Sequence, residues 1–327
     1  MSSELRLSDQ LAPSEWLRLL ARIGADRGYY EGLGRDHAAL YAKGSAETLL
    51  VSFESMAHIR ATAASGAPLG FEIADPKGWS HLSLIAKRET WFRARPVWDY
   101  FDRQIDAGFF EEFDRVIFYG AGMGGYAAAA FSVAAPGSTV ILTAPQATLA
   151  PDRAAWDMRF LEERRRDFTS RYGFAPDMVE AAEAAFVIYD PSDTEDAMHA
   201  SLFHGDHVHR IRYRRGGAGA IDADIRTMGV LAAAMEAAAA GELSPLAFHR
   251  ALRARRQHTP WLRAAMGRVM ATERPYLTGL FARAALREQD VPRFQKVLET
   301  AEASLALKGQ ALPLVRQGAE RQAGQGT

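Results

Sequence analysis

Cysteine is absent from this chain of 327 residues, and its absence excludes several chemistries at once. Without a thiol there is no disulfide, no thiolate zinc site, no cysteine nucleophile and no thiol redox centre. Long apolar runs are also missing. No stretch approaches the roughly 18 residues of a membrane span, and the N-terminus has no apolar segment of signal-peptide length. We therefore expect a cytoplasmic protein that does not associate with membranes.

An excess of charge of either sign is missing too. The formal net charge is −1 and the isoelectric point is near 6.8, so nothing draws the chain as a whole to nucleic acid. Hydrophobic residues make up 48% and charged residues 24%, which are ordinary values for a globular protein with a sizeable core. The length allows one large domain or two modest ones.

The sequence does contain a series of short apolar segments separated by helical patterns. The segments that we predict as strands are 48–53, 81–85, 116–119, 139–143, 185–189 and 208–213. The third is apolar at every position, which is typical of a central parallel strand covered on both faces. In the last, arginines alternate with apolar residues, which indicates an edge strand. Strands that alternate with helices predict an α/β fold with three layers and a mostly parallel sheet.

Helical patterns dominate at both ends of the chain. Residues 14–42 have apolar side chains at helical spacing, and no strand is predicted after about Gly241. The segment 276–303 is distantly similar to one tetratricopeptide-type hairpin. A polar excursion over 147–183 has the composition of a cap inserted between two strands. We therefore expect four parts: a helical segment over 1–44, an α/β domain over 45–241, a helical domain over 242–320 and a frayed tail over 321–327.

The strongest local signal is the glycine-rich turn after the third predicted strand, which reads Gly-Ala-Gly-Met-Gly-Gly from Gly120 to Gly125. One interpretation is a dinucleotide-binding turn, because Gly120, Gly122 and Gly125 match G-x-G-x-x-G. Such glycines let a pyrophosphate approach the N-terminus of a helix. The next strand, however, carries no acidic residue to hold a ribose hydroxyl. A nucleotide-dependent enzyme that uses this turn is therefore the alternative hypothesis.

The other interpretation is a nucleophile elbow, and here the chain resembles the α/β-hydrolase family. Gly120 and Gly124 match the flanking glycines of the family motif G-x-S-x-G. Asp190 follows the strand 185–189, where the family places its catalytic acid. The resemblance covers about residues 48–241 and implies the α/β-hydrolase fold.

Two departures from the family pattern bear on function. The nucleophile position holds Gly122, which has no hydroxyl, and the loop 214–219 has no histidine where the base belongs. Asp190 is left as a vestigial acid. Without a nucleophile and a base, an acyl-enzyme cannot form. The resemblance therefore implies a degenerate member that does not hydrolyse esters.

Any ligand is expected at the turn and at the loops beside it. The candidate ligand-binding residues are Gly120, Gly122, Met123, Gly124, Ser52, Ser55, Arg214 and Arg215. The two serines follow the first predicted strand, where the resemblance places an oxyanion loop. The two arginines occupy the loop where the base would lie. Guanidinium groups near a helix N-terminus favour a small anionic ligand.

No metal and no cofactor are expected. His204, His207 and His209 lie close in sequence, but their spacing matches no metal motif and indicates a polar loop that enters an edge strand. Chains that this one resembles are sometimes labelled phosphoadenosine phosphosulfate reductase. That activity needs a reactive cysteine and a Ser-Gly-Gly phosphate loop, and the sequence has neither. We expect a binding protein that takes a small anion at the turn, or a protein partner or second copy at the C-terminal helices.

Overall fold

The computed structural model describes residues 11–63, 65–214 and 220–313. The chain divides into two compact units, Met1–Ala254 and Arg255–Thr327.

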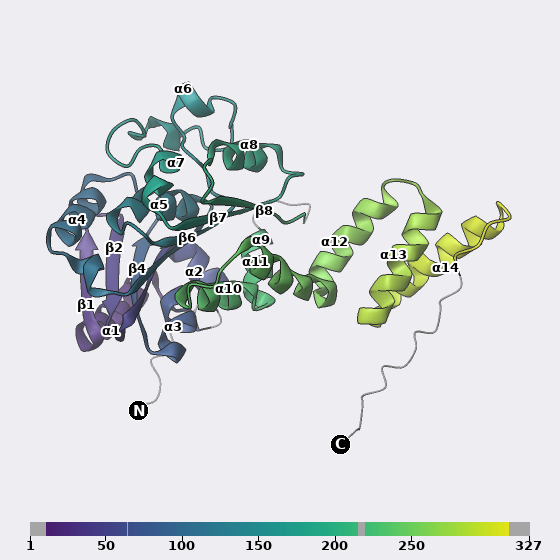
Figure 1. Ribbon diagram of the computed structural model, residues 1–327, viewed down its shortest axis with the longest axis horizontal. Helices are drawn as coiled ribbons and strands as arrows, with labels where there is room; N and C mark the ends of the chain where they lie inside the picture. The colour runs from purple at the N-terminus through teal and green to yellow at the C-terminus, as the bar shows by residue number, and fades with distance from the viewer. Residues whose placement is uncertain (1–10, 64, 215–219, 314–327) are drawn as a thin grey trace, which may run out of the picture. The chain divides into compact units, whose positions relative to one another are not determined.

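The first unit, here called the α/β unit, is built on one sheet of eight strands in the order β1-β2-β4-β3-β5-β6-β7-β8 (Figure 1). The strands are β1 (Gly28–Leu33), β2 (His37–Ala42), β3 (Ser45–Ser55), β4 (Trp79–Ala86), β5 (Arg115–Ala121), β6 (Thr139–Thr143), β7 (Ala184–Tyr189) and β8 (Val208–Arg212). Only β2 runs against its two neighbours, and every other pair is parallel. This order and direction are those of the α/β-hydrolase fold, and the prediction that 208–213 is an edge strand is confirmed.

Helices cover both faces of the sheet, which makes the three layers predicted from the sequence (Figure 1). The helices of this unit are α1 (Pro13–Arg27), α2 (Met56–Thr62), α3 (Leu69–Ile73), α4 (Arg95–Asp106), α5 (Met123–Phe131), α6 (Pro151–Ala154), α7 (Ala175–Met178), α8 (Thr194–Leu202), α9 (Ala220–Thr227), α10 (Val230–Ala239) and α11 (Pro245–Ala251). One core joins α4 and α5 to the sheet, and a second joins α1 and α2 to its other face.

The prediction that residues 14–42 are largely helical is wrong beyond Arg27. The segment continues as β1 and β2, which form a hairpin, and β2 pairs with β4. Its sequence, His-Ala-Ala-Leu-Tyr-Ala, has helix-compatible alanines, yet all six residues are buried in the sheet. Tertiary pairing has overridden local propensity here. The expected N-terminal helical segment therefore supplies two strands of the sheet as well as α1.

The larger core is held by stacked aromatic rings under the central strands. The ring of Phe131 on α5 lies 5.7 Å from that of Phe53 on β3 and 4.3 Å from that of Phe101 on α4. Both contacts are near-parallel, the offset-stacked range of aromatic pairs. Helix α5 is buried from Gly124 to Phe131, because its run of alanines lets it lie close to the sheet. The turn that precedes α5 is thereby fixed to the middle of the core.

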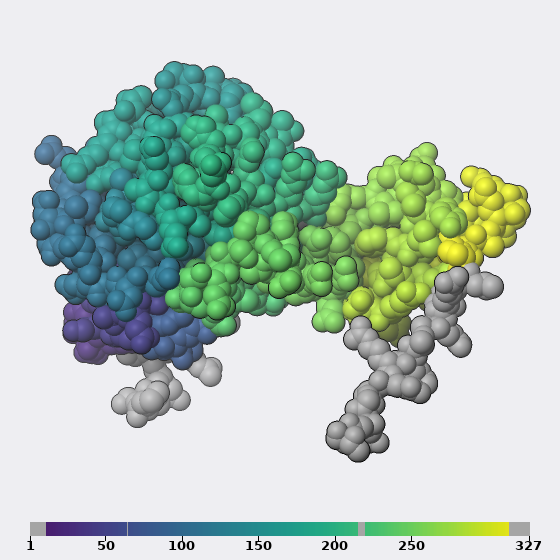
Figure 2. All heavy atoms as spheres, viewed as in Figure 1, coloured from purple at the N-terminus to yellow at the C-terminus, as the bar shows by residue number. Residues whose placement is uncertain are grey.

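The excursion between β6 and β7 is tied down by a buried cluster of charged groups. His199 Nδ1 accepts a hydrogen bond from the Ala147 amide at 3.1 Å, so its Nε2 carries the proton and donates to Asp157 at 2.9 Å. Arg159 also donates to Asp157 and to Asp196. Burial raises the pKa of Asp157, but the hydrogen bonds from His199 and Arg159 outweigh it and hold that pKa well below its usual value. Figure 2 shows the excursion, in teal, on the surface of this unit.

The second unit, here called the helical unit, contains α12 (Thr259–Met270), α13 (Pro275–Glu288) and α14 (Pro292–Ala306). Each helix has a proline in its first turn, where the missing N–H costs nothing. Its core contains Leu262, Met266, Ala282, Ala285 and Phe294. No helix within the described ranges of the chain has the length and apolar character needed to cross a bilayer.

Candidate functional site

The glycine turn has the backbone geometry of an elbow between β5 and α5. Gly122 precedes α5 with φ 53° and ψ −118°, a conformation that side-chain-bearing residues rarely adopt. Its amide donates to the Thr143 carbonyl at 2.8 Å, and its carbonyl accepts from the Tyr126 amide at 3.0 Å. The turn is therefore held by β6 on one side and by the first turn of α5 on the other.

The flanking glycines are required by close packing within the fold. A Cβ at Gly120 would lie 2.0 Å from the Gly124 carbonyl oxygen, and a Cβ at Gly124 would lie 2.1 Å from the Phe53 carbonyl oxygen. Neither position can hold a side chain without moving backbone. Of the glycines that match the dinucleotide pattern, Gly120 is thus required by packing inside the protein, and no pyrophosphate is needed to explain it.

Gly122 differs from its neighbours because its side-chain direction is empty. A Cβ built there meets no atom within 4 Å. The elbow thus has the space for a nucleophile side chain and the strained backbone that would present one, but no side chain.

A cavity of about 180 Å³ opens beside the elbow. Its lining comes from the ends of β3 and β5, the segment after β4, and the helices α2, α5 and α9: Phe53, Glu54, Ser55, His58, Glu89, Tyr119, Ala121, Met123, Gly124 and Arg226. This volume is below the roughly 300–1,000 Å³ of drug-sized ligand sites. It suits a ligand of a few heavy atoms and is too small for a dinucleotide.

The polar floor of the cavity is organised around Asp222 on α9, which is 4% exposed. Asp222 Oδ2 accepts from His58 Nε2 at 2.9 Å, and its other oxygen accepts from the Tyr119 hydroxyl. Because Nε2 donates, the neutral imidazole of His58 keeps a lone pair on Nδ1 and can take a proton there. His58 comes from α2 and is 34% exposed, so the ring is open to the cavity and to solvent.

Arg226, one turn further along α9, joins the floor to β3. Its Nη2 donates to Glu54 Oε2 at 3.3 Å, and its Nε lies 3.0 Å from Asp222 Oδ2. Glu54 Oε1 also accepts from the Leu69 amide at 2.9 Å and the Ser52 hydroxyl at 3.1 Å. The single guanidinium is thus shared between two buried carboxylates.

The pKa shifts in this cluster follow from that arrangement. Burial raises the pKa of Asp222, but hydrogen bonds from His58 and Tyr119 and the charge of Arg226 outweigh it, so the pKa lies below its usual value. Burial and the neighbouring Asp222 raise the pKa of Tyr119 well above its usual value. Asp222 is therefore ionised and Tyr119 neutral at pH 7.

The structure brings only some of the predicted ligand-binding residues to this cavity. Met123, Gly124 and Ser55 line it, and the Ser55 hydroxyl accepts from the His58 amide at 3.0 Å as the N-cap of α2. Ser52 is buried and donates to Glu54, and its hydroxyl oxygen accepts from the Ser83 hydroxyl at 3.2 Å. Gly120 and Gly122 are not among the described residues that line the cavity.

Among the described residues, neither Asp190 nor Arg214 lines the cavity. Asp190, which is 1% exposed, accepts from the amide and the hydroxyl of Ser192 at 2.8 and 2.5 Å. It stabilises the turn after β7. Arg214 is exposed, and Arg215 lies outside the described residues.

His204, His207 and His209, the histidines after α8, are the possible metal ligands considered from the sequence. In the ranges that the structure describes, no group of three or more potential ligands is placed to hold an ion. His207 Nε2 bonds to the Val179 carbonyl at 3.1 Å, which ties the entry of β8 to the end of the excursion.

Sequence reasoning missed His58, Tyr119, Asp222 and Arg226. A usable signal was present, because ligand sites of parallel sheets lie at the carboxyl ends of strands. His58 comes three residues after β3, and α9 is the first helix after β8. The order of the family places the base in the loop after β8, whereas the histidine beside the elbow comes from the segment after β3.

No protein-family model and no curated protein matches the chain. Among solved structures it is similar to a Pyrobaculum calidifontis esterase, at 14% identity and a TM-score of 0.40 over 74% of this chain and 97% of that one. It is also similar to the capsule O-acetyltransferase of Neisseria meningitidis serogroup A, at 13% identity and a TM-score of 0.36 over 54% and 83%. An acetyl ester-xyloside bifunctional hydrolase from Caldicellulosiruptor lactoaceticus gives 13% identity and a TM-score of 0.43 over 67% and 98%. Values this low carry no inference about activity, and the fold assignment rests on strand order and the elbow.

Proposed function

We propose that this protein uses the α/β-hydrolase fold to bind a small ligand at the elbow and forms no acyl-enzyme. Gly122 carries the proposal. It occupies the strained position from which the nucleophile of this fold attacks, its side-chain direction is open, and it has no side chain. Asp190 is engaged by Ser192, and the sequence has no histidine between Ile211 and Gly241. The triad of the fold is thus missing two of its three members.

The charges in the cavity favour a neutral or cationic ligand over the anion suggested by the sequence. Arg226 is shared between Glu54 and Asp222, and the exposed Glu89 adds a further carboxylate to the lining. An incoming anion would meet a net negative surrounding without a free cation among the described lining residues. A small hydrogen-bonding ligand could place an acceptor at the first amides of α5 and a donor at a carboxylate.

A thermal-shift screen tests the binding proposal. Small neutral amides and polyols, amines, carboxylates and phosphates are compared as classes. At about 100 times its dissociation constant, a ligand adds about 2.7 kcal/mol to the free energy of unfolding. The stabilisation should disappear in Ala121→Leu, which fills the cavity, and persist in Ala107→Leu, an exposed site at the end of α4. No shift with any class, or one that survives Ala121→Leu, would refute the proposal.

The His58–Asp222 pair favours one second candidate, ester hydrolysis by a water molecule without a covalent intermediate. His58 Nδ1 would take the proton of the water as its oxygen attacks the ester carbonyl. The tetrahedral intermediate would then break its bond to the alkoxy oxygen, and the leaving alcohol would take the proton back from His58. The two candidates separate in one assay with p-nitrophenyl acetate. Turnover that falls by about 100-fold or more in His58→Gln supports the second candidate, and hydrolysis at the rate of buffer alone supports the first.

A further inference from the structure

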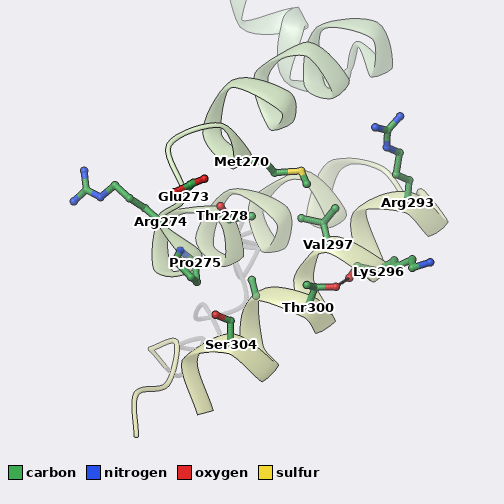
Figure 3. A pocket seen from close by; sticks show the side chains of 11 residues that line it. Met270, Glu273, Arg274, Pro275, Thr278, Arg293, Lys296, Val297, Thr300 and Ser304 are labelled. Atoms are coloured by element: carbon green, nitrogen blue, oxygen red, sulfur yellow. Dashed lines mark hydrogen bonds between the residues drawn. The ribbon is translucent and has the colours of Figure 1, made fainter. Parts of the chain in front are cut away.

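The helical unit carries a groove of about 520 Å³ along one face of α14. Val297, Ala301 and Ser304 line it at positions i, i+4 and i+7, so they lie on one side of the helix. Pro275 and Thr278 of α13 form the opposite wall (Figure 3). Val297 is half-buried and Ala301 only 4% exposed, so the floor is apolar and preformed. Its volume falls within the roughly 300–1,000 Å³ of ligand sites.

The edge of this groove is positively charged. Arg274, Arg293 and Lys296 belong to its lining, and Figure 3 shows their charged ends extending away from the floor. Glu273 is the one acidic residue in the described lining. Within the described part of the chain none of the three cations pairs with a carboxylate, whereas Arg283, on the same unit, pairs with Glu302 at 3.0 Å. The groove therefore combines an apolar floor with unpaired cations at its edge.

We propose that this groove docks an acidic amphipathic peptide segment of a partner protein. The apolar side chains of such a segment would lie on Val297 and Ala301, and its carboxylates would pair with Arg293, Lys296 and Arg274. Nucleic acid fits less well, because single strands are bound through aromatic stacking platforms and no aromatic side chain is among the described lining residues. The proposal is independent of the elbow cavity.

The test is a selection from a displayed library of random 12-residue peptides against the full chain. Enriched peptides should combine Asp or Glu with Leu, Ile or Phe. Their binding, measured by fluorescence polarisation, should weaken at least tenfold in the double variant Arg293→Glu/Lys296→Glu. It should also weaken as sodium chloride is raised, because exposed charges are screened. The matched control is Arg263→Glu, an exposed site on α12 away from the groove, for which less than a twofold change is expected.

Three results would overturn the proposal. The first is no enrichment, or enrichment of basic peptides. The second is equal loss of binding in Arg263→Glu, which would indicate the general charge of the unit instead of the groove. The third is tighter binding of a 12-nucleotide single strand than of any selected peptide. Thr300→Trp, which fills the exposed part of the groove without changing charge, should abolish peptide binding, and circular dichroism verifies that each variant is folded.

Discussion

The two units of this protein have opposite charge and treat their charged residues differently. Residues 1–254 contain 27 basic and 34 acidic side chains, a formal charge of −7, whereas residues 255–327 contain 12 and 6, a charge of +6. In the α/β unit the charged groups of the candidate site form a closed network, meaning that they pair with one another: Arg226 pairs with both Glu54 and Asp222. In the helical unit the cations at the groove edge have no partner among the described residues.

This contrast separates a surface that stabilises the fold from one that is open to a partner. Removing one member of a buried, internally paired cluster lowers the free energy of unfolding, since it leaves the other members unpaired. A row of exposed, unpaired cations contributes little to folding and is available to a partner. The near-neutral charge of the whole chain hides this difference between the two units.

The largest change in stability is expected when a substitution breaks the closed network. Asp222→Ala leaves His58, Tyr119 and Arg226 without their shared acceptor, and we expect the free energy of unfolding to fall by about 3–5 kcal/mol. Urea unfolding followed by circular dichroism measures the change. The control is Glu299→Ala, an exposed carboxylate of α14, which should cost less than about 0.5 kcal/mol. Equal costs for the two variants would contradict the description of the site as a paired, buried network.

The next effect is a pH dependence confined to the α/β unit. Burial lowers the pKa of His37, which is 1% exposed, from 6.5 to about 4. The folded state then binds fewer protons than the unfolded state between these values, so stability is lost as pH falls from about 6.5 to 4. At 1.36 kcal/mol per unit the full loss is about 3 kcal/mol.

Urea titrations at pH 7 and pH 4.5 test this dependence. In His37→Gln the difference in unfolding free energy between the two pH values should shrink by about 2 kcal/mol, since most of the window has been crossed by pH 4.5. His258→Gln, in the helical unit, is the comparison. An unchanged difference in the His37 variant would show that the pKa of this histidine is the same in the folded and unfolded states.

The smallest expected effect is on the helical unit. Arg293→Glu/Lys296→Glu should change the free energy of unfolding by less than about 0.5 kcal/mol, because neither side chain has an ion-pair partner among the residues that the structure describes. Thermal unfolding measures it. A loss of several kcal/mol would mean that these cations stabilise the unit and that the groove edge is not free for a partner.

Much of the fold could be predicted from the sequence, because the central strands and the elbow depend on local patterns. All six predicted strands are present, and the spacing of Gly120 and Gly124 reports a close approach that only glycine allows. The two N-terminal strands could not be predicted because β2 is rich in alanine, and its strand conformation depends on pairing with β4.

The site was harder to predict because it depends on which strand ends meet. Asp222 and His58 are 164 residues apart, and no local pattern pairs them. The sequence shows that Asp190 follows β7, but a position after a strand does not predict the hydrogen-bond partner of the side chain, which here is Ser192. The groove on α14 follows from helical spacing, yet only the packed unit shows that this face remains open.

The most direct test of the central claim is the intact mass of the protein after treatment with a fluorophosphonate ester and with p-nitrophenyl acetate. These reagents leave a covalent mark on an activated serine. We predict no adduct at any serine of the α/β unit, because the elbow holds Gly122 and Ser55 is engaged as the N-cap of α2. A stoichiometric adduct that maps to Ser55, lost in Ser55→Ala and in His58→Gln, would contradict the claim and identify a working nucleophile at this elbow.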